Sequence, residues 1–354
     1  MSIKSNIAEL QAFLADQPTY STHEHLRYES DAVKSVECEQ EDILWLYTLH
    51  YTKSDLISSG ATKADVAFIG NPQHSFVDRH HRLSKFGARS QNTTQMKTLH
   101  AALRALYGGD IFDLNQATEM ETRRKEIHRA GLYREILQEK GKLQLLCRDW
   151  GDEFREQQYF RTAVRMEEWI GISSLCDLQK LESESDRSIL NLADLTSVVR
   201  EQAEKLIAKG AIAFKNAMIY QRNPAWVRRS TFDAENAFSI LTKYLHADWV
   251  SNGSAWRPEL QPLQDYIYGE ICALAAERNV PMQIHTGLPE GNCLPLDWGD
   301  PTHFLELIRC FPKLEIHLMH LGHPYEPYAI AMAKMLIPVQ AAHHNEMMPP
   351  AGTE

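Results

Sequence analysis

Residues 281–320 read PMQIHTGLPEGNCLPLDWGDPTHFLELIRCFPKLEIHLMH, and this stretch decides the fold. Its two ends, PMQIH at 281–285 and LEIHLMH at 314–320, are short apolar runs, which predict strands. Between them, residues 301–311 have the apolar spacing of an amphipathic helix. A strand, a helix and a second strand in this order predict a βαβ unit with two parallel strands.

The same alternation extends toward the N-terminus at intervals of roughly 35 residues. Helical patterns separate the further strand candidates, which cover residues 19–26, 142–148, 162–170 and 211–215. Repeated βα units predict a parallel α/β fold. We count about six strands and expect them in a parallel α/β barrel of the TIM type.

Residues 30–140 depart from this alternation and read as helices. Met96, Leu99, Leu103 and Leu106 keep helical spacing, and two glycines follow them at 108 and 109. We interpret the region as a helical insertion after the first strand, without separate folding. The predicted organisation is one barrel over residues 1–335, with the insertion at about 30–140 and an irregular tail at 336–354.

Composition narrows the class of protein. The 354 residues carry 37 Lys and Arg against 47 Asp and Glu, a net charge of −10, which argues against a general nucleic-acid binder. No apolar run is long enough to span a bilayer, and the N-terminus has no signal-peptide core. The six scattered cysteines suit reduced thiols. We therefore expect a soluble cytoplasmic protein that acts on a small molecule, without membrane or nucleic-acid partners; a homo-oligomer is compatible with the sequence.

Histidines close three of the predicted strands: His23 and His25 the first, His285 and His320 the last two. The carboxyl ends of barrel strands converge on one mouth, where active sites lie. Residues two apart in a strand face the same way, so His23 and His25 suit one metal ion. An isolated H-x-H pair arises by chance, and a lone strand-end histidine is more often a hydrogen-bonded core residue. The combination on separate strands favours a metal site.

A lysine closes another predicted strand, AIAFK at 211–215. Burial in a barrel mouth would lower the pKa of Lys215. Three interpretations remain open: a carboxylated lysine that bridges two metals, a cation that holds an anionic substrate, and a rim lysine with its head in water. Arg222, in the following loop, would extend an anion-binding surface or stand as a solvated loop charge.

Several of these motifs together resemble the amidohydrolase superfamily, and within it the amidohydrolase-2 branch. They are His23-Glu24-His25, Lys215, His285 in QIHTG and His320 in MHLGHPY. The resemblance covers about residues 18–336, and the long helical insertion is similar to that of uronate isomerases. It implies a metal-bearing (β/α)8 barrel with His23, His25 and His285 as metal ligands. It also implies that His320 is a further ligand or a catalytic group.

The sequence departs from that family in two places. Ser21 stands where the family has an Asp two residues before the first histidine. The family also ends its eighth strand with an Asp that ligates metal or acts as general base, and no residue up to Glu354 matches it. We expect the sequence to be truncated or out of frame beyond about residue 335, so that two βα units are missing. Loss of the general base would lower the rate by roughly 10²–10⁴-fold.

The resulting prediction is a metal-dependent hydrolase that uses activated water on an amide, lactone or related bond of a small, anionic substrate. Zinc is the expected metal, with Mn and Fe as alternatives. His320 and Lys215 are the catalytic candidates, and Lys215 and Arg222 the substrate-binding ones. Two alternatives remain: a sugar-acid isomerase like the uronate isomerases, and a catalytically impaired barrel that binds a ligand or partner.

Overall fold

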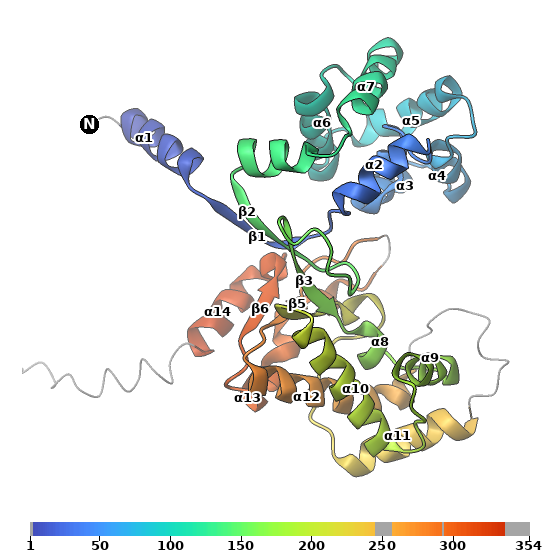
Figure 1. Cartoon of the computed structure of the whole chain (residues 1–354), viewed down its shortest axis with the longest axis vertical. Helices are drawn as coiled ribbons and strands as arrows, with labels where there is room; N and C mark the ends of the chain where they lie inside the picture. Colours follow the sequence, from blue (N-terminus) through green and yellow to red (C-terminus); the bar gives the residue numbers. More distant parts are fainter. Residues whose placement is uncertain (1–2, 245–256, 292–293, 337–354) are drawn as a thin grey trace, which may run out of the picture. The chain divides into compact units, whose positions relative to one another are not determined.

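The computed structural model describes residues 3–244, 257–291 and 294–336. Within these residues, six strands belong to one sheet, and their order in the sheet follows their order in the chain. The strands are β1 (Thr19–Glu24), β2 (Leu143–Arg148), β3 (Phe160–Arg165), β4 (Ala213–Asn216), β5 (Met282–His285) and β6 (Ile316–Met319). Helices follow β1 and β3 to β6, as in a (β/α)8 barrel, whereas β2 leads to β3 without a helix (Figure 1). The sheet corresponds to part of a TIM barrel, which confirms the prediction of an incomplete barrel with about six strands.

Strands β3 to β6 pair in parallel, and their register aligns the carboxyl ends that carry the predicted site. Arg165 pairs with Lys215, and Lys215 pairs with Gln283. His285 pairs with Met319, the residue before His320. Side chains from segments far apart in the sequence are therefore brought to one edge of this sheet.

The chain divides into two compact units. The first comprises Met1–Cys147, Arg155–Phe160 and Glu290–Cys293, and the second comprises Arg148–Phe154, Arg161–Pro289 and Leu294–Glu354. The predicted insertion lies within the first unit. The predicted tail at 336–354 lies outside the described residues except for its first position.

The first unit is mainly helical. A bundle of helices follows β1 and surrounds its own core, which includes Ile43, Leu56, Leu83 and Met96 (Figure 1). Its elements are α2 (Glu29–Glu37), η1 (Trp45–Thr48), α3 (His50–Ser58), α4 (Lys63–Gly70), α5 (Phe76–Ser90), α6 (Thr94–Tyr107) and α7 (Leu114–Ile127). Helix α1 (Ile3–Asp16) precedes β1, and a π-helical segment, η2 (Arg134–Lys140), precedes β2.

Local capping explains where the helices of the bundle begin and end. Thr62 and Asp65 form a capping box at the start of α4, in which each side chain accepts a hydrogen bond from the other residue's backbone N–H. Gly108 ends α6 with a φ of 69°, a conformation that favours glycine. The helical prediction for residues 30–140 is realised in its second half by α6, α7 and the π-helical segment.

The second unit surrounds β3 to β6 with helices. Its helices are α8 (Glu167–Ile170), α9 (Leu175–Ser185), α10 (Leu192–Ala208), α11 (Thr231–Tyr244), α12 (Gln261–Arg278), α13 (Leu305–Cys310) and α14 (Glu326–Leu336). Short 3₁₀ turns complete it: η3 (Met218–Tyr220), η5 (Pro258–Leu260), η6 (Leu296–Gly299), η7 (Pro301–Phe304) and η8 (His320–Gly322).

The core of the second unit joins its helices to its strands. Leu195 and Val199 of α10 and Ile271 of α12 belong to the same buried cluster as Phe214 and Ile284 of the strands. Each such side chain contributes about 1.5–3 kcal/mol by leaving water. The cluster therefore supplies the rigid base on which the strand ends present polar groups.

The observed strands and helices bear on two predictions, the strand over residues 162–170 and the absence of a membrane-spanning segment. The strand predicted over 162–170 ends at Arg165, because residues from Glu167 onward form the short helix α8. None of the described helices combines the length and apolar character needed to cross a bilayer.

Candidate functional site

Strand β1 carries the histidine pair. His23 lies within β1, and His25 follows immediately after the strand ends at Glu24. The two ring centroids are 4.7 Å apart in an edge-to-face arrangement, with 77° between the ring planes. Ser21, which replaces the expected Asp, donates a hydrogen bond of 2.7 Å to Glu24 Oε1. The pair offers adjacent imidazole nitrogens, the donor type that zinc prefers.

A third imidazole of the same unit joins this pair. His50, the first residue of α3, has its ring nearly parallel to that of His25, with centroids 6.3 Å apart. Its Nδ1 lies 2.9 Å from Glu290 Oε2. Sequence reasoning missed His50 because it begins a helix of the insertion and no spacing connects it with β1.

In the second unit, the end of β4 forms a buried ion pair. Lys215 Nζ lies 3.1 Å from Asp149 Oδ2, and both side chains are fully buried. Burial lowers the pKa of Lys215 below its usual value, while the charge and hydrogen bond of Asp149 oppose the change. A carboxylated lysine would carry a negative charge toward Asp149, so this contact favours the interpretation of Lys215 as a cation.

Arg165, the last residue of β3, belongs to the same cluster and was also missed. Its Nε donates a 2.7 Å hydrogen bond to the backbone oxygen of Asp149, and its Nη2 lies 3.5 Å from Asp149 Oδ2. The side chain is 37% exposed, whereas Lys215 is closed to solvent. The predicted strand continued to residue 170, and this concealed Arg165 as a strand-end residue.

The ends of β5 and β6 bring two predicted site residues together. The His285 ring, almost buried, lies 4.5 Å from the His320 ring between centroids. Tyr220 Oη lies 3.4 Å from His285 Nε2. Thr286 Oγ1 donates a 2.5 Å hydrogen bond to the backbone oxygen of Met319, which ties the two loops together.

Arg222 occupies a different environment from the one predicted. Its Nη2 donates a 2.8 Å hydrogen bond to Asp265 Oδ1, and its Nη1 donates one to the backbone oxygen of Asn223. Arg229 contacts the other carboxylate oxygen of Asp265 at 3.0 Å. The guanidinium of Arg222 is thus part of a buried ion cluster, and its role in substrate binding stays a prediction.

The predicted metal ligands belong to different units. His23 and His25 lie in the first unit and His285 in the second, and each unit has a defined geometry of its own. A ligand set that combines all three therefore stays a prediction. The predicted ligand set takes His23 and His25 from the pair on β1, and His285 from the pair that it forms with His320.

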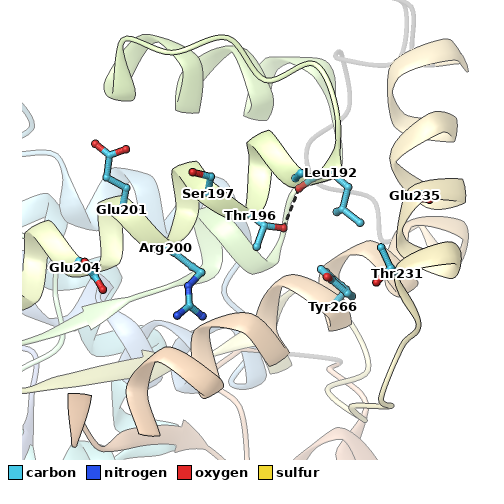
Figure 2. A pocket seen from close by; sticks show the side chains of 10 residues that line it. Leu192, Thr196, Ser197, Arg200, Glu201, Glu204, Thr231, Glu235 and Tyr266 are labelled. Atoms are coloured by element: carbon cyan, nitrogen blue, oxygen red, sulfur yellow. Dashed lines mark hydrogen bonds between the residues drawn. The ribbon is translucent and has the colours of Figure 1, made fainter. Parts of the chain in front are cut away.

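A cavity of about 610 Å³ lies away from these strand ends, between α10, α11 and α12. Figure 2 shows Thr196 and Arg200 of α10 facing it, with Tyr266 of α12 and Thr231 of α11 along its side. No predicted site residue lines it. Arg200 forms an ion pair with Glu277 at 2.8 Å, and the candidate catalytic groups lie at the strand ends.

Comparison with known proteins gives matches at the level of sequence. The family model described as Amidohydrolase (Amidohydro_2) matches residues 249–342. Protein fluG of Emericella nidulans is 26% identical over 119 residues, which is 32% of this chain. The matched segment spans 13% of that relative.

Solved structures are similar over most of the chain. The uronate isomerase of Thermotoga maritima has a TM-score of 0.64 at 15% identity, covering 92% of this chain and 76% of its own. The glucuronate isomerase of Caulobacter crescentus has a TM-score of 0.63 at 16% identity, covering 89% and 70%. A presumed metal-dependent hydrolase of Lactobacillus casei has a TM-score of 0.53 at 15% identity, with the same two coverages. Residues 249–342 therefore resemble the amidohydrolases in sequence, and the chain shares its fold with the uronate isomerases.

Proposed function

We propose that this chain is a metal-dependent hydrolase that acts on an amide, lactone or related bond of a small, anionic substrate. The observation that carries the proposal is the pair His23 and His25 at the end of β1, with ring centroids 4.7 Å apart. The amidohydrolase match and the barrel fold support the same class of chemistry. We also propose a small-molecule substrate, a cytoplasmic location and no nucleic-acid or membrane partner.

The donor set fits a divalent metal. His23, His25 and His285 would hold it through imidazole nitrogens, which suit zinc first and manganese or iron as alternatives. When bound, such an ion lowers the pKa of water and polarises a carbonyl group. The carboxylate of Glu290 at His50 Nδ1 resembles the contacts that orient metal-site imidazoles, which supports a role for the insertion in holding this site.

The chain's own residues would do the rest of the work. Lys215 and Arg165 supply positive charge at neighbouring strand ends, where they would hold a substrate carboxylate. Arg222 pairs with Asp265 of α12 and not with a residue at the strand ends, so we assign anion binding to Lys215 and Arg165, of which Arg165 is the exposed one. His320, beside His285, would transfer a proton to the leaving group.

A second candidate is a sugar-acid isomerase, and two observations favour it. Two of the similar solved structures are a uronate isomerase and a glucuronate isomerase. The helical insertion brings His50 next to His25, which adds a group able to move a proton between neighbouring carbons of a sugar acid. Both candidates use the same imidazoles and the same cations, and they differ in the bond that changes.

Metal content and a substrate panel test the proposal. We expect the purified protein to hold about one zinc, manganese or iron per chain, by elemental analysis. The double variant His23→Ala/His25→Ala should retain metal at least ~100-fold less tightly, since loss of a contact beyond the ligands already costs 10–100-fold. The exposed His81→Ala is the matched control and should leave metal content unchanged.

The panel separates the two candidates. Acid release from lactones or amides supports the hydrolase, and conversion of uronates between aldose and ketose forms supports the isomerase. Equal metal content in the double variant and the wild type would rule out both, because both depend on the β1 pair.

A further inference from the structure

Asp149 is a buried carboxylate that no step of the proposed chemistry uses. It follows β2, its side chain has no exposed surface, and it belongs to the second unit. Its Oδ2 contacts Lys215 Nζ at 3.1 Å, and its backbone oxygen accepts the 2.7 Å hydrogen bond from Arg165 Nε. One residue therefore holds two cations that come from different strands.

The register of the strands makes this arrangement specific. Arg165 and Lys215 are direct neighbours in the β3–β4 pair, so without a counterion two positive charges would stand side by side. A like-charge pair in a buried setting is strongly unfavourable. Asp149 offsets one of the two charges and fixes both side chains in place.

Glu167 is the other acidic group of this cluster. It begins α8, and its carboxyl group accepts a hydrogen bond from the backbone N–H of Ala217. Burial raises the pKa of Glu167, which disfavours its charged form. Asp149 is therefore the carboxylate that directly pairs with the cations at this edge of the sheet.

We propose that Asp149 is a positioning residue that sets the charge of the substrate site. Asp149 holds Lys215 and Arg165 and neutralises one of their two positive charges, so this pair contributes a single net positive charge, beside that of the bound metal, which suits one substrate carboxylate. The inference rests on the proposed function, because it assigns Lys215 and Arg165 to substrate binding. It adds a preference in substrate charge. Monocarboxylates such as aldonates should bind more tightly than neutral sugars, and a second carboxylate should add little affinity.

The test compares two probes that differ by one carboxylate, D-gluconate and D-glucarate. Their dissociation constants are measured by calorimetry on the metal-loaded wild type and on Asp149→Asn. Removal of the negative charge should shift the ratio of the two affinities toward the dicarboxylate by at least ~tenfold. Asp42→Asn is the matched control, since Asp42 pairs with the buried Arg79 in the helical bundle, and its ratio should equal that of the wild type.

A second variant keeps the test decisive if Asp149→Asn does not fold. Arg165→Gln removes charge of the opposite sign from a side chain that is about one-third exposed. It should weaken binding of both acids, with the larger loss for D-glucarate.

Three outcomes would overturn the inference. One is an unchanged affinity ratio in folded Asp149→Asn. The second is loss of bound metal from that variant, which would make Asp149 a metal ligand. The third is a wild type that binds neither acid. The metal measurements on the β1 variants and the substrate panel decide the proposed function separately, so failure of the inference can be told apart from failure of the proposed function.

Discussion

Two aspartates of the second unit have nearly the same immediate chemistry and different positions in the fold. Asp149 and Asp265 are both fully buried, and each contacts two basic side chains. Asp265 lies on α12 and holds Arg222 and Arg229 from the loop after η3. Asp149 lies at a strand end and holds cations that come from two strands.

The difference between the two clusters follows from what surrounds them. Trp226 Nε1 donates a 2.8 Å hydrogen bond to the backbone oxygen of Asp265, so this cluster fastens a loop to a core helix. Each cluster has a partly exposed arginine, Arg229 at 25% and Arg165 at 37%, but the Asp149 cluster lies at the strand ends, the edge where barrel enzymes bind substrates. The same ion triad can therefore anchor a loop or prepare a binding site, and its place in the fold decides which.

The largest expected effect would sharpen this comparison. Asp265→Asn leaves the buried Arg222 without its counter-charge, so we expect a loss of about 3–5 kcal/mol in the free energy of unfolding. Urea denaturation measures this loss. The ratio of D-gluconate to D-glucarate affinity should stay at the wild-type value, because the cluster lies outside the proposed site. A loss below ~1 kcal/mol would indicate that the pair is not structurally important.

The next effect in size is the pH dependence of anion binding, which distinguishes Lys215 from the arginines because only the lysine loses its proton in the alkaline pH range. In the proposed site the ammonium form of Lys215 would bind the anion, and burial lowers the pKa of this group below its usual value. Binding should therefore be complete below the folded-state pKa and fall as the pH rises through it, before an ordinary lysine would lose its proton. We expect D-gluconate affinity to decline as the pH rises through the folded-state pKa of Lys215, at a lower pH than an ordinary lysine would require.

The control for this pH dependence is Lys215→Arg, whose guanidinium keeps its charge over the whole range. Its affinity, normalised to the value near neutral pH, should stay nearly constant. Identical alkaline profiles for wild type and variant would contradict the assignment of Lys215 as the titrating cation.

The smallest expected effect concerns an exposed ion pair, in contrast to the two buried clusters. Glu204 pairs with Arg278 at 2.5 Å on the surface, where both side chains are about half exposed. Glu204→Gln should change the free energy of unfolding by less than ~1 kcal/mol, because solvent screens exposed ion pairs. Glu204 also lines the cavity of Figure 2, so a larger change would indicate that this cavity matters to the fold.

The local patterns predicted much of the sheet and part of the site. The apolar runs ending at His285 and His320 became β5 and β6, and the two imidazoles lie together as neighbouring strand ends require. Lys215 was identified because it closes an apolar run. In each of these cases the relevant signal lies within about seven residues, so sequence reading could find it.

The missed residues share one physical cause. His50 reaches His25 through the packing of a helical bundle, and Asp149 reaches Lys215 across a long stretch of the chain. Neither contact leaves a periodic mark, since each depends on how separate elements pack. Arg222 is the reverse case, a residue that the sequence predicted for substrate binding. Its place in a loop after β4 gave no sign that it would form a buried ion pair with Asp265.

The amino-acid sequence determined the succession of strands and helices and the chemical types at the strand ends, because burial of apolar side chains imposes short periods along the chain. The partners of those polar groups were decided by the tertiary structure. A buried cation needs a carboxylate partner, because burial of an unpaired charge is costly. Which carboxylate becomes that partner depends on how distant segments of the chain pack.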